Sequence, residues 1–403
     1  MVVKILRGMA ERYGVISHFP TNSVFEAIYD YTERYIPANA QPRKSILVFD
    51  NMLGWYKFKG RRLDKRLLGD VIFETEGINV AFRVDASSIK KRLNGAVFAQ
   101  ELATSIIESR LNVCVADLNN KSKPMSSFLF CGSTGVGKTE MTKQLSLILF
   151  NDVRRLIRFD MSEYSSPDSL ERFRTSLTQA VWERPYSIIL LDEIEKADGA
   201  ITRLLLQVLD DGRLIDANNR EVTFVNSYII LTTNAGSEIF KNISQYDVSD
   251  VGDGSNLKKY ERNIRKSLAS TNDGKFPAEL LGRIDCIVPF QPLSLNTHQR
   301  ILENRMRKVK EDVMSKYNID VVYDKSVRDY IMSDLDVVSD SGGARTTIAK
   351  FESDVLSQIA AFLNKHLSDK IKRIYVECQG ILRTDSKNNL ENNAKIVVRA
   401  IRS

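Results

Sequence analysis

The segment Gly132–Thr139 restricts the possible fold more than any other part of this 403-residue sequence. It reads GSTGVGKT, follows the apolar run Ser127–Cys131 and precedes a helix that we expect over Met141–Phe150. A strand, a glycine-rich turn and a helix in this order form a loop whose backbone N–H groups and helix N-terminus bind phosphates. We therefore expect a nucleoside-triphosphate site on an open α/β sheet.

The positions of this loop have different expected tasks. The glycines allow the backbone to curl around the phosphates of ATP, Lys138 would reach the terminal phosphates, and the hydroxyl of Thr139 would bind Mg²⁺. The residues expected to contact the nucleotide are Gly132, Ser133, Thr134, Gly135, Val136, Gly137, Lys138, Thr139 and Glu140.

A second apolar run ends in two carboxylates. Ser187–Leu191 is strand-like and is followed by Asp192 and Glu193. Ligands of open α/β sheets bind at the carboxyl ends of the strands, so both side chains should lie beside the glycine-rich loop. Asp192 suits a ligand of Mg²⁺, and Glu193, which the metal does not need, suits orienting and deprotonating an attacking water. The two motifs together favour ATP hydrolysis over a purely structural glycine-rich turn.

Length and composition exclude several classes of protein. The chain is too long for one ordinary core and favours two or three domains. No apolar run approaches the roughly 18–20 residues that cross a bilayer, and the first residues lack a signal-peptide pattern, so we expect a cytoplasmic protein without a membrane partner. The cysteines are far apart and only three histidines accompany them, which disfavours a zinc site. We expect all four to be structural, namely Cys114, Cys131, Cys286 and Cys378.

Alternation of strand-like and helix-like segments predicts the fold class α/β, a phosphate-loop NTPase with a mostly parallel sheet flanked by helices. The further strand-like runs are Leu156–Asp160, Ser227–Thr233 and Asp285–Phe290. Beyond Pro292 the pattern is mainly helical, with amphipathic runs at Thr297–Lys316 and Thr347–Lys370 and short strand-like runs at Asp320–Val322 and Ile374–Glu377. The stretch from 236 to 275 is polar, which is typical of a mobile insertion.

We divide the chain into three domains. Residues 1–92 are expected to form a small basic α+β domain of unknown role, residues 93–290 a large nucleotide-binding domain, and residues 291–403 a small, mainly helical domain. In the first domain the pattern predicts a helix over Ser23–Tyr35 and short strand-like runs at Ser45–Phe49, Val71–Phe73 and Ile78–Val84.

The positive charge of the chain is concentrated in the first domain. Residues 1–92 hold 16 Lys and Arg against 10 Asp and Glu, whereas the two kinds of charge nearly balance in the remainder. Cations and aromatics interleave most densely in Trp55–Arg66. Such a segment can contact nucleic acid or an acidic protein surface, or it can be an ordinary solvated face.

Several further motifs occur in a fixed order and identify a family. They are GSTGVGKTE (132–140), DMSE (160–163), RPYSIILLDEIEKA (184–197), LQVLDDGRL (206–214), TTNAGS (232–237), FPAELLGRID (276–285) and GGAR (342–345). Together they closely resemble the C-terminal AAA+ module of the Clp family of protein-remodelling ATPases, of the ClpB and ClpA type. The resemblance covers about 97 to 380 and leaves residues 1–92 without a counterpart.

The resemblance implies roles for three residues outside the two nucleotide motifs. Asn234 resembles the sensor-1 residue, which helps to hold the attacking water, and Arg345 resembles the sensor-2 arginine of the small domain. Arg283 resembles the arginine finger, which in this family reaches the nucleotide of the adjacent subunit, so the chain would act as a ring-type homo-oligomer, typically a hexamer. Val97–Gln100 stands where the family has an adenine-side segment, with Ala99 in place of a glycine.

The sequence departs from the family between DMSE and RPYS. The family carries there a long glycine-rich loop with an aromatic residue that grips substrate polypeptide, whereas residues 164–183 contain no glycine. Phe173 could replace that aromatic, but the spacing of Phe173, Leu177 and Val181 favours one apolar helix stripe. The chain also lacks an Ile-Gly-Phe or Ile-Gly-Leu tripeptide, so we do not expect a Clp peptidase as partner.

These observations favour an ATP-hydrolysing AAA+ oligomer that remodels or moves a protein partner without threading it. The alternative is a nucleic-acid-associated AAA+ ATPase, such as a loader or a defence or mobile-element factor, in which residues 55–66 engage phosphates and bases. A static scaffold that binds ATP without turnover is disfavoured by the joint presence of Glu193, Asn234 and Arg283.

Overall fold

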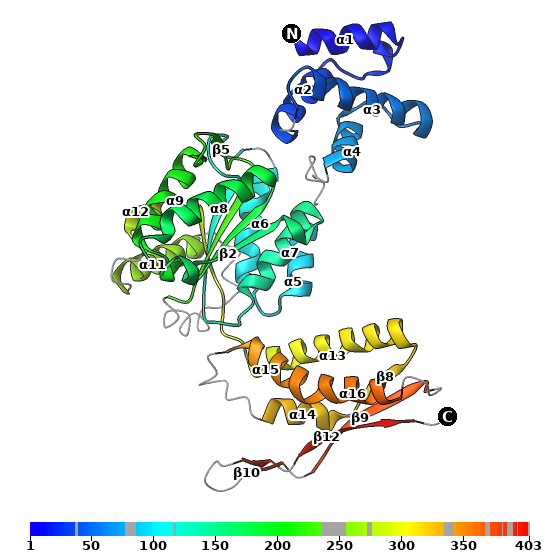
Figure 1. The fold of residues 1–403 in the computed structure, drawn as a ribbon, viewed down its shortest axis with the longest axis vertical. Helices are drawn as coiled ribbons and strands as arrows, with labels where there is room; N and C mark the ends of the chain where they lie inside the picture. Colours follow the sequence, from blue (N-terminus) through cyan, green and yellow to red (C-terminus); the bar gives the residue numbers. More distant parts are fainter. Residues whose placement is uncertain are drawn as a thin grey trace.

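Three groups of elements follow one another along the chain (Figure 1). The computed structural model describes residues 1–36, 39–76, 86–115, 118–235, 255–271, 276–333, 342–366, 371–380, 382–384, 390–392 and 394–401. Helices come first, a parallel sheet between helices forms the middle, and a second group of helices lies on a small sheet at the C-terminal end. Within these ranges, no helix is long and apolar enough to span a membrane.

The middle group is built on a five-stranded parallel sheet in the order β2-β3-β6-β1-β7. Its strands are β1 (Ser126–Cys131), β2 (Leu156–Asp160), β3 (Ile188–Asp192), β6 (Tyr228–Thr233) and β7 (Cys286–Pro289). All five coincide within one or two residues with the strand-like runs of the sequence. The expected parallel α/β sheet is therefore confirmed.

Helices cover both faces of this sheet, so its central strands are buried throughout. In β1, Phe128 and Phe130 pack on the side of α6 (Glu101–Val115) and α7 (Lys138–Phe150), whereas Leu129 and Cys131 pack on the side of α8 (Ser169–Glu183) and α9 (Gly199–Asp211). Strands buried on both faces read as continuous apolar runs, which explains why the sequence pattern located them well.

Shorter elements complete the middle group. They are η2 (Val153–Arg155), η3 (Met161–Tyr164), η4 (Ile194–Lys196), the hairpin of β4 (Arg213–Ile215) and β5 (Glu221–Thr223), α11 (Ser255–Thr271) and α12 (Ala278–Arg283). Of the predicted polar insertion at 236–275, the structure describes α11, and the remaining positions lie outside the described residues.

The first group corrects our expectation of an α+β domain, because the regular elements of its described residues are all helices. Its elements are α1 (Val2–Arg12), η1 (Ile16–His18), α2 (Ser23–Tyr35), α3 (Arg43–Lys59), α4 (Lys65–Glu76) and, leading into the middle group, α5 (Ala86–Ala96). The helix expected over Ser23–Tyr35 is confirmed. The run expected at Ile78–Val84 lies outside the described residues.

The two remaining strand predictions in this region were wrong for a common reason. Ser45–Phe49 lies inside α3 and Val71–Phe73 inside α4. In α3 the buried positions continue from Val48 and Phe49 to Met52 and Leu53, which is the i, i+3, i+4 spacing of a helix. A window of five residues is too short to separate this period from the alternation of a strand.

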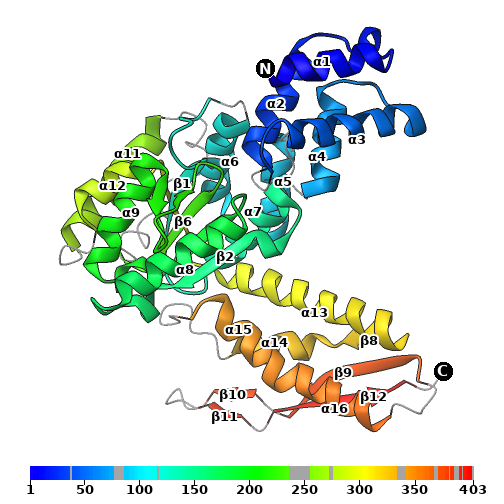
Figure 2. The ribbon, with the colours of Figure 1, turned by 45° about the horizontal axis from the view of Figure 1, so that its top comes forward.

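The C-terminal group packs helices on a three-stranded sheet of order β12-β9-β8 (Figure 2). Its helices are α13 (Leu295–Tyr317), α14 (Lys325–Ser333), α15 (Ala344–Lys350), the π-helical η7 (Phe351–Leu356) and α16 (Ser357–Lys365). Its strands are β8 (Asp320–Tyr323), β9 (Arg373–Gln379) and β12 (Lys395–Ala400), with a separate hairpin of β10 (Leu382–Thr384) and β11 (Leu390–Asn392). A core of its own holds this group together, as expected for a mainly helical small domain.

The segment between β2 and β3 is compact. It consists of η3 and α8, and Phe173, Leu177 and Val181 are at most 1% exposed on the side of α8 that faces the sheet. Phe173 also makes an edge contact with Tyr164, at 5.1 Å between ring centroids. The interpretation of these residues as one apolar helix stripe is confirmed.

We expect Phe173→Ala to destabilise the chain by about 3–5 kcal/mol, because it removes a fully buried ring from a packed core. Trp182→Ala is the control on the same helix. Trp182 is 55% exposed and stacks on Arg220, so its loss should cost about 1 kcal/mol or less. Denaturant unfolding of the two variants measures both values, and equal losses would contradict the assignment of Phe173 to the core.

Candidate nucleotide-binding site

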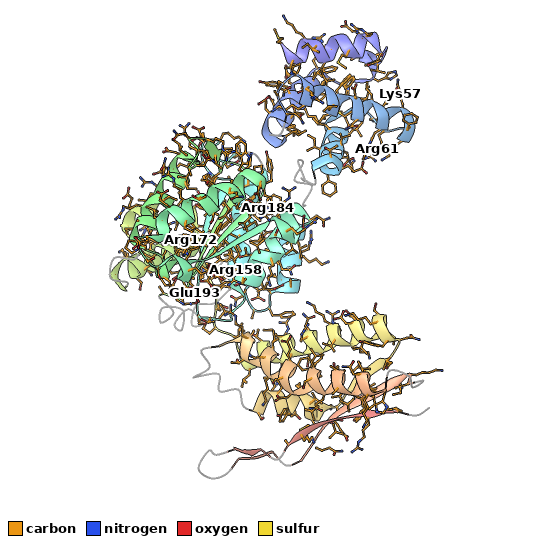
Figure 3. All side chains as sticks on the ribbon, in the orientation of Figure 1. Lys57, Arg61, Arg158, Arg172, Arg184 and Glu193 are labelled. Atoms are coloured by element: carbon orange, nitrogen blue, oxygen red, sulfur yellow. The ribbon has the colours of Figure 1, made fainter. Side chains whose placement is uncertain are left out.

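The carboxyl ends of three neighbouring strands meet at one edge of the sheet. β1 pairs with β6 so that Cys131 lies opposite Thr233, and β3 pairs with β6 on its other side. The residues that follow these ends are Gly132, Glu193 and Asn234. Strand pairing therefore brings together the glycine-rich loop, the carboxylates and the sensor-like asparagine. Glu193 is labelled in Figure 3 and marks this edge of the sheet.

Lys138 is buried inside the loop that carries it. Its ammonium group donates to the carbonyl oxygens of Gly132 and Ser133 and, at 2.8 Å, to Oδ1 of Asn234. Burial lowers the pKa of Lys138 to about 8, although neighbouring acidic groups act in the opposite direction. A desolvated ammonium satisfied by three oxygens is ready to exchange some of them for phosphate oxygens.

Asp192 is held at the end of β3 by two side chains from neighbouring strands. It accepts a hydrogen bond from the hydroxyl of Thr232 on β6, and its Oδ2 lies 2.7 Å from the guanidinium of Arg158 on β2. The carboxylate is only 10% exposed in its side chain. These contacts fix its orientation toward the loop end of the sheet.

Glu193 begins the turn after β3 in a left-handed conformation, with φ of 57°. Its backbone N–H donates to the same Thr232 hydroxyl at 3.0 Å, which secures the turn. One carboxylate oxygen pairs with Lys196, and the other lies 3.4 Å from the amide nitrogen of Asn234. Glu193 is 30% exposed in its side chain, so water can reach it.

Three positioning residues were missed by the sequence analysis. Glu195 accepts the backbone N–H of Asn234 at 3.1 Å, and its other oxygen is buried without a hydrogen-bond partner in the described part of the chain. Thr232 and Arg158 bind Asp192, as described above. Glu195 stands two residues after Glu193, Thr232 near the end of β6, and Arg158 two residues before the end of β2. These positions can be read from the sequence, but only the strand order reveals that the three side chains converge.

The C-terminal group contacts the glycine-rich loop through two glycines. Gly135 has φ of 77°, and a Cβ atom at this position would lie 2.0 Å from the carbonyl oxygen of Gly342. Gly343 approaches Thr134 and Gly135 in the same way, and Ala344 donates its N–H to Gly135 at 3.1 Å. Arg345 follows at the start of α15 and is exposed. The GGAR motif therefore lies directly on the loop.

The segment Val97–Gln100 lies on another side of the loop. Ala99 adopts φ of 56°, the conformation that a glycine would take without strain, so the substitution leaves the expected backbone shape in place. The amide of Gln100 donates to the carbonyl oxygens of Val136 and Gln291, and its oxygen accepts the N–H of Gln291 at 2.8 Å. Gln100 thus links the loop to the start of the C-terminal region.

Arg283 lies far from these residues, at the opposite end of β1. Its carbonyl oxygen is 3.5 Å from the hydroxyl of Ser127, at the beginning of the strand, and its side chain pairs with Asp210 of α9. The five steps along the chain from Ser127 to Gly132 span about 16 Å in an extended strand. The structure therefore brings Arg283 together with none of the other expected catalytic residues of its own chain.

The oxygen donors at the edge of the sheet fit Mg²⁺. Asp192 supplies a carboxylate and Thr139 a hydroxyl in the first turn of α7, and Mg²⁺ in phosphate sites takes its other ligands from phosphates and water. Cys131 ends β1 beneath the loop, where complete burial raises the pKa of its thiol far above the usual range. Its position in the core agrees with a structural role.

Comparison with known proteins agrees with this geometry. The profile described as "AAA domain (Cdc48 subfamily)" matches residues 123–287. The chain is 36% identical over 240 residues to the chloroplastic chaperone protein ClpB2 of Oryza sativa subsp. japonica, covering 57% of this chain and 24% of that protein. It is 32% identical over 286 residues to the chaperone protein ClpB of Chlamydia caviae, covering 67% and 32%. The chain thus spans about a quarter to a third of the curated relatives that it matches.

The fold also resembles a solved structure. A closed-state cryo-EM reconstruction of Hsp104 with ATPγS and FITC-casein superimposes with a TM-score of 0.74 and 23% identity, covering 98% of this chain and 68% of that one. At this identity the likeness concerns the fold alone.

Replacing Gly135 with alanine should disrupt the contact between the loop and the GGAR motif. The new methyl group would overlap the backbone of Gly342 and the left-handed φ would be strained, so we expect ATP affinity to fall at least about tenfold. Gly95→Ala is the matched control, since nothing lies within 4 Å of its Cβ and a helical alanine stabilises slightly. Fluorescent-nucleotide titration of both variants checks this, and equal affinities would argue against the contact.

Proposed function

Because the chain belongs, through residues 123–287, to the AAA+ ATPases of the Clp type, we propose that it hydrolyses ATP as a ring-forming oligomer and uses the cycle to remodel a protein partner. The observation that carries this proposal is the convergence of Lys138, Glu193 and Asn234 at one edge of the sheet. The domains would be residues 1–92, 93–290 and 291–403.

The contacts of the site support the following order of events. The γ-phosphate of ATP takes the place of Asn234 as a partner of the Lys138 ammonium, which releases the asparagine side chain. Asn234, held through its backbone by Glu195, then positions the attacking water with Glu193. Glu193 must leave Lys196 to accept the proton of that water. Mg²⁺, when bound by Asp192 and Thr139, would neutralise charge on the phosphates.

The position of Arg283 favours a site shared between subunits. Arg283 lies at the beginning of β1, whereas the phosphate loop follows the end of that strand. The length of the strand is too great for the Arg283 side chain to reach the phosphate loop of its own chain. It is 35% exposed and is held by Asp210, whose other partner is Lys123. An arginine presented in this way suits the nucleotide of an adjacent copy in a closed ring, for which we propose six subunits.

The segment between β2 and β3 supports a mechanism without threading. A threading AAA+ ring needs an aromatic side chain that projects into the central pore. In this segment Tyr164 and Phe173 are buried against the sheet, and the exposed Trp182 is in the last turn of α8, where Arg220 lies over its ring. We propose that the partner is moved through an external surface of the ring. The N-terminal helices lie outside residues 123–287, which the family model matches.

We predict that Glu193→Gln retains ATP and loses turnover by a factor of about 100 or more, because the amide cannot accept the proton of the attacking water. Lys138→Ala should lose ATP binding itself, since the loop loses its only internal ammonium. Equilibrium nucleotide binding and phosphate release, measured on the same preparations, separate the two effects. Normal turnover in the Glu193 variant would sink the assignment.

We predict that Arg283→Ala lowers turnover about 10³-fold without weakening ATP binding, because the finger acts on charge that develops during phosphoryl transfer. Mixing this variant with Glu193→Gln should restore part of the activity, since a mixed ring contains some sites with both residues intact. Arg307→Ala, an exposed arginine of α13, is the control. Absence of recovery in mixed samples that do form rings would contradict a shared site.

A further inference from the structure

One surface of the N-terminal helices combines exposed aromatic rings with exposed cations, several of which have no ion-pair partner among the described residues. We call it the N-terminal patch, and it lies where α3 ends and α4 begins, next to the end of α1. Its residues are Tyr13, Lys57, Phe58, Lys59, Arg61, Arg62, Lys65 and Arg66. Figure 3 places Lys57 and Arg61 on the outer side of the N-terminal helices, in a different part of the molecule from Glu193.

Phe58 has no role in the core of these helices. Its side chain is 90% exposed, whereas Met52 and Leu53 of the same helix are buried in the core. Tyr13, at the end of α1, is 49% exposed and has the Lys57 ammonium 5.9 Å from its ring centroid. The Phe58 ring is therefore accessible to a planar ligand, and Tyr13 offers a second, partly exposed ring beside Lys57.

The positive charge around these rings is poorly neutralised. No carboxylate in the described ranges lies within ion-pair distance of Lys57, Arg62, Lys65 or Arg66. Of the nearby acidic residues, Asp70 pairs with Arg61, and Asp64 accepts the N–H of Leu67 at the start of α4. The patch therefore attracts a polyanion.

We propose that the N-terminal patch binds single-stranded nucleic acid, with bases stacked on Phe58 and Tyr13 and phosphates paired with the surrounding cations. Stacking on aromatic rings and charge pairing with the backbone are the two interactions by which proteins bind single strands irrespective of sequence. An acidic polypeptide would use the cations and leave the rings in water. A base pair inside a duplex cannot offer its face to a ring, so duplex DNA would gain less.

The test measures binding of a fluorescein-labelled thirty-nucleotide oligo(dT) to the full-length chain by anisotropy, without ATP. We expect binding that weakens steeply between 50 and 200 mM salt, because phosphate pairing releases counterions. Phe58→Ala should weaken binding roughly 5- to 100-fold through the loss of stacking. Leu47→Ala, which removes another exposed apolar side chain from α3, should leave binding unchanged.

A charge-reversal pair tests the cations separately. Arg62→Glu combined with Lys65→Glu should reduce the affinity and the salt dependence, whereas Lys308→Glu combined with Lys365→Glu, on exposed positions of the C-terminal helices, should not. Thermal unfolding of each variant checks that the helices remain folded. Because these side chains are exposed, their replacement should leave the helices folded, and lost binding then reports lost contacts with the oligonucleotide.

Three results would overturn the proposal. They are absence of oligo(dT) binding at low salt, equal affinity for a thirty-base-pair duplex, and an affinity for heparin or polyglutamate that depends on Phe58 as strongly as that for oligo(dT). The last result would assign the patch to an acidic protein or polysaccharide. Because the measurement uses no ATP, its failure would leave the proposed ATPase cycle unaffected, and an inactive ATPase would not prevent oligo(dT) binding.

Discussion

The parallel pairing of β1, β3 and β6 is the constraint on which the site depends. Each of these strands is followed by a residue of the site, and their register brings Gly132, Glu193 and Asn234 to one edge. Side chains from the same strands then fix the details, since the Thr232 hydroxyl binds both the carboxylate of Asp192 and the N–H of Glu193. The chemistry of the site thus follows from backbone hydrogen bonding within a buried sheet.

The sequence predicted this part of the molecule well because local and tertiary signals agree there. Buried strands read as short apolar runs, and the loop spacing leaves little conformational choice. The same reasoning did not find Glu195 or Arg158, because their roles depend on which strands become neighbours. It also could not indicate that Lys138 bonds to Asn234, since nearly a hundred residues separate the two in the chain.

The N-terminal region shows the opposite case. Val48 and Phe49 belong to a helix whose buried face extends to Leu53, and a short apolar run carried no information about that continuation. The charge pattern was the more reliable signal, because exposed cations need no packing partner. Within Trp55–Arg66 the cations and Phe58 are exposed, whereas Trp55 is only partly exposed and is covered by the Lys59 ammonium, 3.6 Å from its ring centroid.

The glycine contact between the loop and the GGAR motif has a mechanical consequence. Gly135 and Gly342 approach so closely that the loop cannot change its shape at this point without displacing the backbone that leads into α15. α15 packs against α13, a helix of 23 residues that extends about 34 Å. A small rotation at the glycines would therefore move the far end of α13 several times farther than the loop itself.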